Sequence, residues 1–141
     1  MRKEKIRPTA ICVCRDAGRI LVAEYYEEGR RYYRPLGGAI EFGEHGDAAV
    51  QREFHEEISA SLIDVQYLGM LENIYTVGGV QTHQIMLVYD GRLSDPGLYK
   101  KDILQGNELG EPFKAAWKRL EEFGPGKPPL YPDGLLELLE G

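Results

Sequence analysis

Residues 38–60 read GAIEFGEHGDAAVQREFHEEISA, and this stretch decides what fold and what chemistry the rest of the chain supports. Its second half is rich in Ala, Glu, Arg and Gln, which are good helix formers. At about 100° per residue, Val50, Phe54 and Ile58 form one apolar stripe, and the neighbouring flank is acidic. The stretch therefore predicts a helix with one face in the core and a carboxylate cluster beside it.

The acidic flank consists of Glu53, Glu56 and Glu57. Like charges three or four residues apart destabilise a helix by roughly 0.2 to 0.5 kcal/mol per pair, and Arg52, one turn before Glu56, relieves only part of this. A hard divalent cation such as Mg²⁺ would neutralise the cluster, because it binds a few carboxylates and completes its shell with water and phosphate oxygens. The spacing leaves two interpretations open, a solvated acidic face and a metal site.

The wider pattern favours the metal site. Six glycine or charged positions fall at fixed separations around the apolar Phe54: Gly38, Glu44, Arg52, Glu53, Glu56 and Glu57. This pattern closely resembles the Nudix box, G-x5-E-x7-R-E-u-x-E-E-x-G-u, where u is apolar. Two positions depart from it, since Ser59 stands where the family has Gly and Ala60 is only weakly apolar. Gly usually serves a helix end that needs φ > 0, so Ser59 bears on the local turn and not on the metal ligands.

The resemblance implies an α/β fold, the Nudix-like α/β/α sandwich with a mixed β-sheet. It also implies a Mg²⁺-dependent hydrolase, with Mn²⁺ as a substitute cation. The expected reaction is cleavage of a diphosphate bond in a nucleoside di- or triphosphate, or in a nucleoside diphosphate linked to another moiety. Homodimers are frequent among similar proteins. The alternative is a module on the same fold that binds or senses a nucleotide without cleaving it, although such modules typically lose box carboxylates and this chain retains them all.

Roles for the box residues follow from the same resemblance. The expected metal ligands are Glu53, Glu57 and Glu56, with the Gly38 carbonyl and Glu44 as further candidates. Glu56 is also the expected general base, and Arg52 would orient it. A carboxylate that binds Mg²⁺ or pairs with Arg52 is a weak base, however.

Four residues outside the box complete the candidate site. Arg34 lies beside the Gly37-Gly38 turn and is a candidate phosphate contact, with an exposed edge residue as the alternative. Tyr33 is a candidate for stacking on a base, although any single Tyr is more often packed in a core. Glu108 and Glu111 are candidates for an alternative general base, and the competing interpretation is that both face solvent.

Length and composition set the class of protein. A chain of 141 residues, 43% of them hydrophobic, fits one domain over residues 1–141 with a sizeable core. The net charge of −6 argues against a nucleic-acid duplex or an anionic membrane as partner, because both need a basic surface. Cys12 and Cys14 are expected as free buried thiols, which suggests a reducing compartment. Without a long apolar segment at the N-terminus, the expected location is the cytoplasm.

Several strands surround the predicted helix. Residues 9–14 and 19–25 predict a hairpin with Gly18 in its turn, and residues 30–34 predict a short strand. Residues 62–77 and 80–93 predict a second, longer hairpin turning at Gly78-Gly79. Residues 85–89 are apolar on both faces, which predicts a central strand.

The last third of the chain is expected to contain less regular structure. Residues 90–110 are polar and predict a long surface loop with one short helical turn. Residues 111–117 predict a short strand, residues 118–123 a helical turn, and the end of the chain a short amphipathic helix. Together with the central strand and the box helix, these elements fit an α/β/α sandwich.

Overall fold

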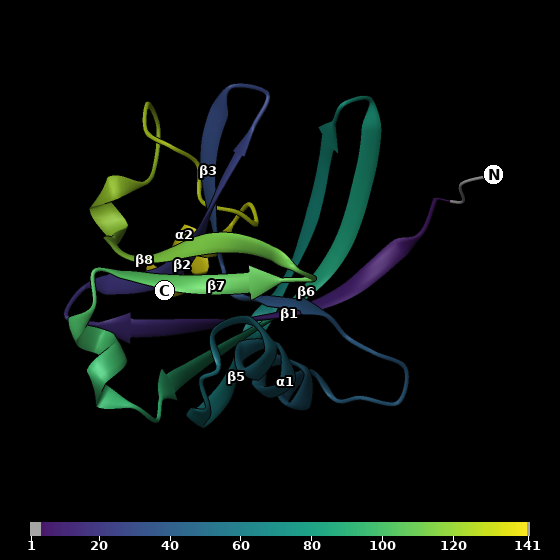
Figure 1. Ribbon diagram of the computed structural model, residues 1–141. Coiled ribbons are helices and arrows are strands. Elements are labelled where there is room, and N and C mark those ends of the chain that lie inside the picture. Colours follow the sequence, from purple (N-terminus) through teal and green to yellow (C-terminus); the bar gives the residue numbers. More distant parts are fainter. Residues whose placement is uncertain (1–3, 141) are drawn as a thin grey trace.

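The computed structural model describes residues 4–140. Figure 1 shows the arrangement of these residues. The strands are β1 (Ile6–Asp16), β2 (Arg19–Glu27), β3 (Arg30–Pro35), β4 (Gly37–Ala39), β5 (Leu62–Val77), β6 (Val80–Leu93), β7 (Ile103–Glu108) and β8 (Glu111–Arg119). The α-helices are α1 (Gly46–Ile58) and α2 (Leu135–Glu140), and two 3-10 turns are η1 (Pro96–Lys100) and η2 (Leu120–Glu122).

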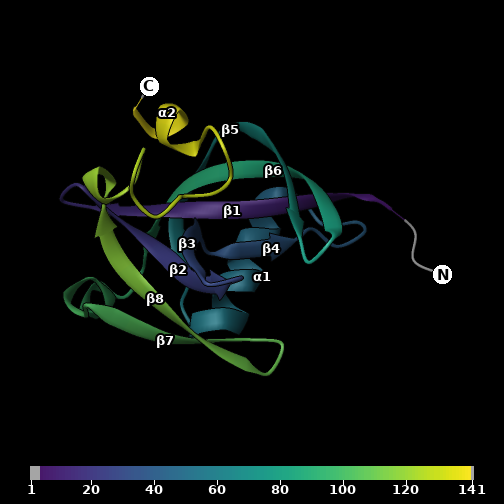
Figure 2. The same ribbon diagram turned by 90° about the horizontal axis from the view of Figure 1, so that it is seen from above.

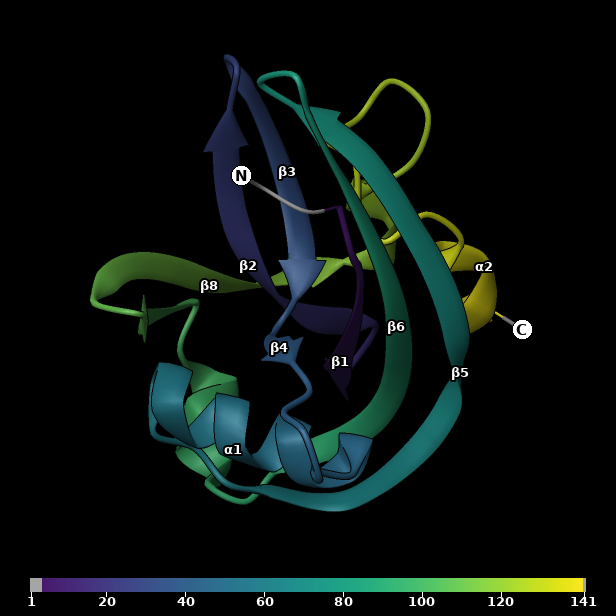
Figure 3. The same cartoon turned by 90° about the vertical axis from the view of Figure 1, so that its right-hand side faces the viewer.

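The strands form one mixed sheet, as the sequence predicts. Their order is β5-β6-β1-β2-β8-β7, with β3 paired to β2 and β4 paired to β1. β1 and β6 are parallel, and the other pairs are antiparallel. Figure 3 shows the β2–β3 and β5–β6 hairpins standing next to one another at the same end of the molecule. This neighbourhood of two hairpins matters for the site.

The predicted first hairpin exists only at its closed end. β1 and β2 pair at Arg15 with Ile20 and at Asp16 with Arg19, around a turn at Ala17-Gly18. Beyond these two pairs the strands separate, because β1 pairs with β6 and β4 while β2 pairs with β3 and β8. The chain therefore opens into two halves of a sheet with a space between them.

The second hairpin is confirmed with the predicted bounds. β5 and β6 meet at Gly78 and Gly79, whose φ values are +59° and +77°. Such angles suit a tight hairpin turn and are adopted most readily by glycine. β6 lies between β5 and β1, so it is the predicted central strand. Met86 and Val88 face one core cluster and Tyr89 faces the other.

The prediction of a long loop over residues 90–110 is wrong in most of its length. β6 continues to Leu93, and Ile103–Glu108 form β7, which pairs with β8 as a hairpin. Only the helical turn is confirmed, as η1. The residues of β7 are mostly polar because β7 is the last strand of the sheet, so its alternation of apolar residues is weak. Pairing with β8 across the turn at Leu109-Gly110 supplies the order that the polar sequence of β7 does not indicate.

Two core clusters cover opposite faces of the β1–β6 part of the sheet. Val50 and Phe54 of α1 belong to the first cluster, which confirms the predicted apolar stripe. Leu135 and Leu139 of α2 belong to the second. Figure 2 shows α1 and α2 on either side of β1 and β6. The layers are therefore helix, sheet and helix, as expected.

Cys12 and Cys14 are free and buried, as predicted. Both belong to the core cluster under α1. Within residues 4–140, none of the helices is long and apolar enough to span a membrane.

Candidate active site

The helix α1 begins and ends as the sequence suggests. His45 is at its N-cap without a side-chain cap bond and is exposed. At the other end Ser59 has φ +54° and ψ +38°, the left-handed conformation that glycine usually adopts there. The Ala60 N–H donates to the Phe54 carbonyl at 3.3 Å, which closes the last turn. The substitution of Ser for Gly in the box thus leaves the turn intact and places strain at Ser59.

Arg52 is the centre of an ion-pair network on the acidic flank of α1. Its Nε and Nη2 atoms donate to both oxygens of Glu44 at 2.8 and 2.9 Å, a bidentate pair. Its Nη1 donates to Glu53 Oε1 at 2.9 Å and lies 3.4 Å from the Glu56 carboxylate. Glu41 lies 3.0 Å from Nε. One guanidinium therefore faces four carboxylates, and the cluster keeps an excess of negative charge.

Glu44 and Glu56 occupy different environments in this network. The Arg52 guanidinium holds the pKa of Glu44 at about 2, so Glu44 is a permanently ionised anchor for Arg52. The Glu56 side chain is 55% exposed and makes only long contacts with Arg52. Glu56 is therefore the box carboxylate that remains accessible to water.

Glu57 is buried, with 6% of its surface exposed. Burial, and then the neighbouring Glu53 carboxylate, raise the pKa of Glu57 to about 9. Two carboxylates this close cannot both ionise at neutral pH without a cation between or beside them. Glu53 and Glu57 are therefore a carboxyl pair that a cation would stabilise.

The Gly37-Gly38 backbone lies against the Glu53 carboxyl and forms a glycine cradle beside this pair. A Cβ atom on Gly38 would lie 2.6 Å from the Glu53 carboxyl carbon, and one on Gly37 would overlap the Ala10 carbonyl. These contacts confirm the predicted close approach of the Gly-Gly backbone. They follow from β4, a short strand that the sequence did not reveal, which pairs with β1 and brings Gly38 over α1.

The residues present fit a hard divalent cation. In the part of the chain that the structure describes, no three His, Cys, Asp or Glu side chains already surround one point. Mg²⁺ does not require that, since it is usually bound by one or two carboxylates and fills its octahedral shell with water and substrate phosphate oxygens. Glu53 and Glu57 would supply two oxygen ligands, and Glu56 and the Gly38 carbonyl are the further candidates from the predicted set.

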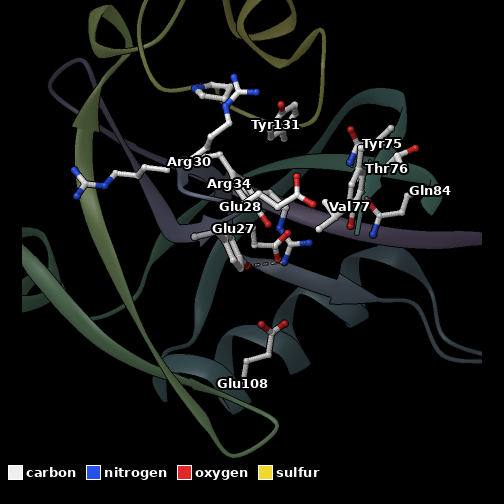
Figure 4. Close-up of a pocket in the computed structure, with 15 residues that line it drawn as sticks. Glu27, Glu28, Arg30, Arg34, Tyr75, Thr76, Val77, Gln84, Glu108 and Tyr131 are labelled. Atoms are coloured by element: carbon white, nitrogen blue, oxygen red, sulfur yellow. Dashed lines mark hydrogen bonds between the residues drawn. The ribbon is translucent and has the colours of Figure 1, made fainter. Parts of the chain in front are cut away.

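A cavity of about 320 Å³ lies between the β2–β3 and β5–β6 hairpins. The box carboxylates do not line it, but Arg34 and Glu108 do, and the charges of both act on Glu57. Figure 4 shows its lining, with Arg34 in the middle and Glu108 on the side of α1. The Arg34 Nη2 donates to the Tyr25 hydroxyl at 3.2 Å, and Arg34 Nε is buried without a hydrogen-bond partner. Burial opposes the charge of Arg34, but Tyr25, Glu108 and Glu57 together raise its pKa. Arg34 is therefore a partly buried cation whose buried Nε is an unused donor, which suits an anionic ligand.

The structure separates several of the predicted residues from one another. Tyr33 is 4% exposed and packs edge-on against Phe123 in the second core cluster, so its position argues against a substrate contact. Tyr32, one residue earlier, lies on the other face of β3 and lines the cavity. Glu108 and Glu111 pair across the β7–β8 hairpin, but Glu108 alone lines the cavity and Glu111 is exposed.

Most of the cavity lining was not predicted from the sequence, and Asn73 on β5 and Gln84 on β6 are the clearest examples. They are directly opposite one another in the ladder, and both line the cavity. The sequence offers little signal for them, because Asn73 follows Glu72 and Gln84 follows His83 in polar surroundings. Only the pairing register shows that they form a pair.

The comparisons with known proteins agree with this geometry. The chain is 38% identical over 66 residues to the NAD-capped RNA hydrolase NudC of Mycobacterium tuberculosis, a match that covers 46% of this chain and 21% of that protein. It thus spans about a fifth of the length of that relative, and the same match recurs with NudC of Mycobacterium bovis.

Two solved structures share the fold. The MutT NUDIX hydrolase of Burkholderia pseudomallei has a TM-score of 0.69 at 21% identity, covering 96% of this chain and 98% of that one. A NUDIX hydrolase of Nitrosomonas europaea has a TM-score of 0.62 at 21% identity, covering 84% and 75% respectively. At these identities the likeness concerns the fold.

The family itself is shown by a model of the whole domain. The family model described as NUDIX domain matches residues 5–137, which is nearly the full chain and includes every box position. The match agrees with the box motif, the mixed sheet and the carboxylate pair on α1. The chain therefore belongs to the NUDIX family.

Proposed function

We propose that this protein is a divalent-metal-dependent pyrophosphohydrolase that cleaves a diphosphate bond in a nucleoside di- or triphosphate or in a nucleoside diphosphate linked to another moiety. The observation that carries the proposal is the pair formed by Glu53 and the buried Glu57 beside Gly38, together with a cavity that contains Arg34. A carboxylate pair with an excess of negative charge suits a cation. The partly buried guanidinium of Arg34 suits the phosphate groups of a substrate.

In this proposal Glu53 and Glu57 hold Mg²⁺, or Mn²⁺ in its place, with Glu56 and the Gly38 carbonyl as additional ligands. Glu44 takes no direct part, because both its oxygens are bound by Arg52. When bound, the cation would neutralise phosphate oxygens and lower the pKa of a water ligand. Arg34 would contact the diphosphate, and Arg52 would keep Glu53 and Glu56 in place.

The general base is proposed to be Glu56. Its carboxylate is 55% exposed and lies 3.4 Å from Arg52, so it is only loosely held and is free to contact a water molecule. Glu108 is the alternative, because it lines the cavity and lies within electrostatic reach of Glu57 and Arg34. Glu111 is a weaker candidate, since it is exposed and does not line the cavity.

The test is hydrolysis of a panel of nucleotides. Nucleoside di- and triphosphates and a dinucleotide such as NAD, the moiety named for the NudC relative, are incubated with Mg²⁺, with Mn²⁺ or with a chelator. We expect a nucleoside monophosphate to be released from at least one compound, and only when metal is present. Glu53→Gln should abolish metal-dependent turnover while the protein still binds nucleotide through Arg34.

The outcome that contradicts the proposal is nucleotide binding without product under any metal condition. That outcome would favour a nucleotide-sensing module on the same fold. Retention of full turnover in Glu53→Gln and Glu57→Gln, with an unchanged Mg²⁺ requirement, would contradict the ligand assignment by itself.

A further inference from the structure

The cavity between the two hairpins contains an unpaired polar group that the proposed chemistry does not use. Asn73 is 3% exposed, and its Oδ1 atom has no hydrogen-bond partner. Its Nδ2 donates to Gln84 Oε1 at 3.0 Å. A buried acceptor without a donor costs stability, and native structures contain few of them, so each one calls for an explanation.

The hydrogen-bonding capacity of the pair is simple to count. A primary amide has one carbonyl acceptor and two N–H donors. The bond from Asn73 to Gln84 uses one donor and one acceptor, so the pair still offers the Asn73 carbonyl and the Gln84 amide nitrogen. Rotating both amides by 180° would exchange these roles. The pair would then offer the Asn73 amide nitrogen as a donor and the Gln84 carbonyl as an acceptor. The pair therefore suits a planar group that carries a donor and an acceptor on neighbouring atoms.

Four tyrosines line the cavity beside the amide pair, and charged side chains from the β2–β3 hairpin and β7 line much of the rest. Tyr25 and Tyr32 are stacked with ring centroids 5.1 Å apart, and Tyr131 meets Tyr32 edge-on at 5.6 Å. Tyr75 lines the side formed by β5, as Figure 4 shows. Flat aromatic walls and a few polar groups are typical of sites for unsaturated ring systems.

The tips of the two hairpins are tied together over this cavity. Glu28 in the β2–β3 turn accepts a hydrogen bond from the Gly78 N–H of the β5–β6 turn at 2.8 Å. The two walls therefore hold a common spacing. A volume of about 320 Å³ is at the small end of the usual range for ligand sites and fits one part of a nucleotide.

We propose that this cavity is the base-binding part of the nucleotide site, and that Asn73 and Gln84 bind the hydrogen-bonding edge of a nucleobase. The proposal rests on the proposed function in one respect, that the ligand is a nucleotide whose phosphates lie at Arg34. The edge of a nucleobase presents a donor next to an acceptor, which matches the free capacity of the amide pair. A second phosphate matches the amide pair less well, because a phosphate dianion offers only acceptors and would leave the buried Asn73 carbonyl without a donor. The charged residues of the lining do not decide the matter, since three glutamates are offset by three arginines.

The test uses reaction products, so it does not depend on turnover. Binding of AMP, GMP, CMP and UMP in the presence of Mg²⁺ is compared with binding of ribose 5-phosphate, which lacks a base, by NMR titration. We expect at least one monophosphate to bind about tenfold or more tightly than ribose 5-phosphate. Asn73→Leu should raise the Kd of that monophosphate about tenfold. The Kd of ribose 5-phosphate should stay within about twofold of its value for the unchanged protein.

Two further variants keep the test decisive. Gln84→Leu should produce the same selective loss through the other half of the pair. Gln81→Leu is the matched control, because Gln81 is on the same strand, exposed and outside the cavity lining, and it should bind every compound as the unchanged protein does. Asn73→Leu should also melt no lower than the unchanged protein, since it removes an unsatisfied buried acceptor.

The inference is overturned if no monophosphate is preferred over ribose 5-phosphate, or if Asn73→Leu and Gln84→Leu bind the preferred monophosphate as Gln81→Leu does. Failure of the proposed function looks different. In that case the nucleotide panel yields no product, while selective base binding and its loss in the two variants are still observed.

Discussion

Metal-free stability should fall steeply with rising pH because of one residue, Glu57. The carboxyl of Glu57 is buried against Glu53, and its pKa is raised from 4.5 to about 9. In the unfolded chain this carboxyl regains its ordinary pKa. Between these two values the folded protein binds a proton at Glu57 that the unfolded chain does not bind, so stability falls as pH rises through this window.

The size of the effect follows from the same two pKa values. The slope is at most about 1.4 kcal/mol per pH unit. Between about pH 5.5 and pH 8.5 the loss is on the order of 3 to 4 kcal/mol, because Glu57 remains largely protonated in the folded state over most of this interval. For a domain of this length, that corresponds to a decrease in Tm of roughly 10 °C.

The assay is thermal unfolding in a chelator at several pH values, for the unchanged protein and for Glu57→Gln. The Gln side chain keeps the shape and does not titrate, so Glu57→Gln should lose most of the pH dependence. Glu56→Gln is the control, because Glu56 is exposed on the same helix turn and should leave the slope unchanged. Added Mg²⁺ should stabilise the unchanged protein most at the alkaline end, where Glu57 must otherwise be ionised without a cation.

The reasoning is refuted if Tm of Glu57→Gln falls with pH in parallel with that of the unchanged protein. Parallel profiles would show that Glu57 has nearly the same pKa in the folded and unfolded states. The Glu53 and Glu57 carboxylates would then not be a close pair, and the ligand assignment would lose its main support.

Three further predictions concern the helix end, the base and the glycine cradle. Ser59→Gly should stabilise the protein by on the order of 1 kcal/mol and raise Tm by about 3 °C, because Ser59 has φ +54°; a lower Tm would contradict this. Glu56→Gln should lower kcat by roughly 10² to 10⁴ with little change in KM, and Glu108→Gln should have a smaller effect; the reverse order would move the general base to β7. Gly38→Ala should raise the Mg²⁺ concentration for half-maximal activity about tenfold with a similar Tm, because its Cβ would lie 2.6 Å from the Glu53 carboxyl carbon; an unchanged requirement would show that the cradle is not needed.

The elements that local sequence could predict are those with strong local signals. The box helix has a 3.6-residue apolar period, and the β5–β6 hairpin has a Gly-Gly turn between two long apolar segments. The left-handed conformation of Ser59 was also open to prediction, because the position calls for a residue at φ > 0 whatever its identity.

The elements that were missed depend on pairing between strands, which the pattern within a single segment does not show. β7 is polar and at the edge of the sheet, so only pairing with β8 defines it, and that pairing in turn brings Glu108 to the cavity. The neighbours Tyr32 and Tyr33 are indistinguishable by composition. They differ because alternate residues of a strand face opposite sides, and the surroundings of β3 decide which side is core.

By itself, the sequence determined the family, the helix that carries the carboxylates, and the identity of those carboxylates, because each is encoded by residues close together in the chain. Only the tertiary structure decided which carboxyl is buried, which one stays accessible, and which side chains line the cavity. Glu57 is buried on α1, which packs against β4 and β7, and the pairing of Asn73 with Gln84 follows from the register between β5 and β6. Desolvation and cross-strand register are properties of that packing, and a one-dimensional pattern contains neither.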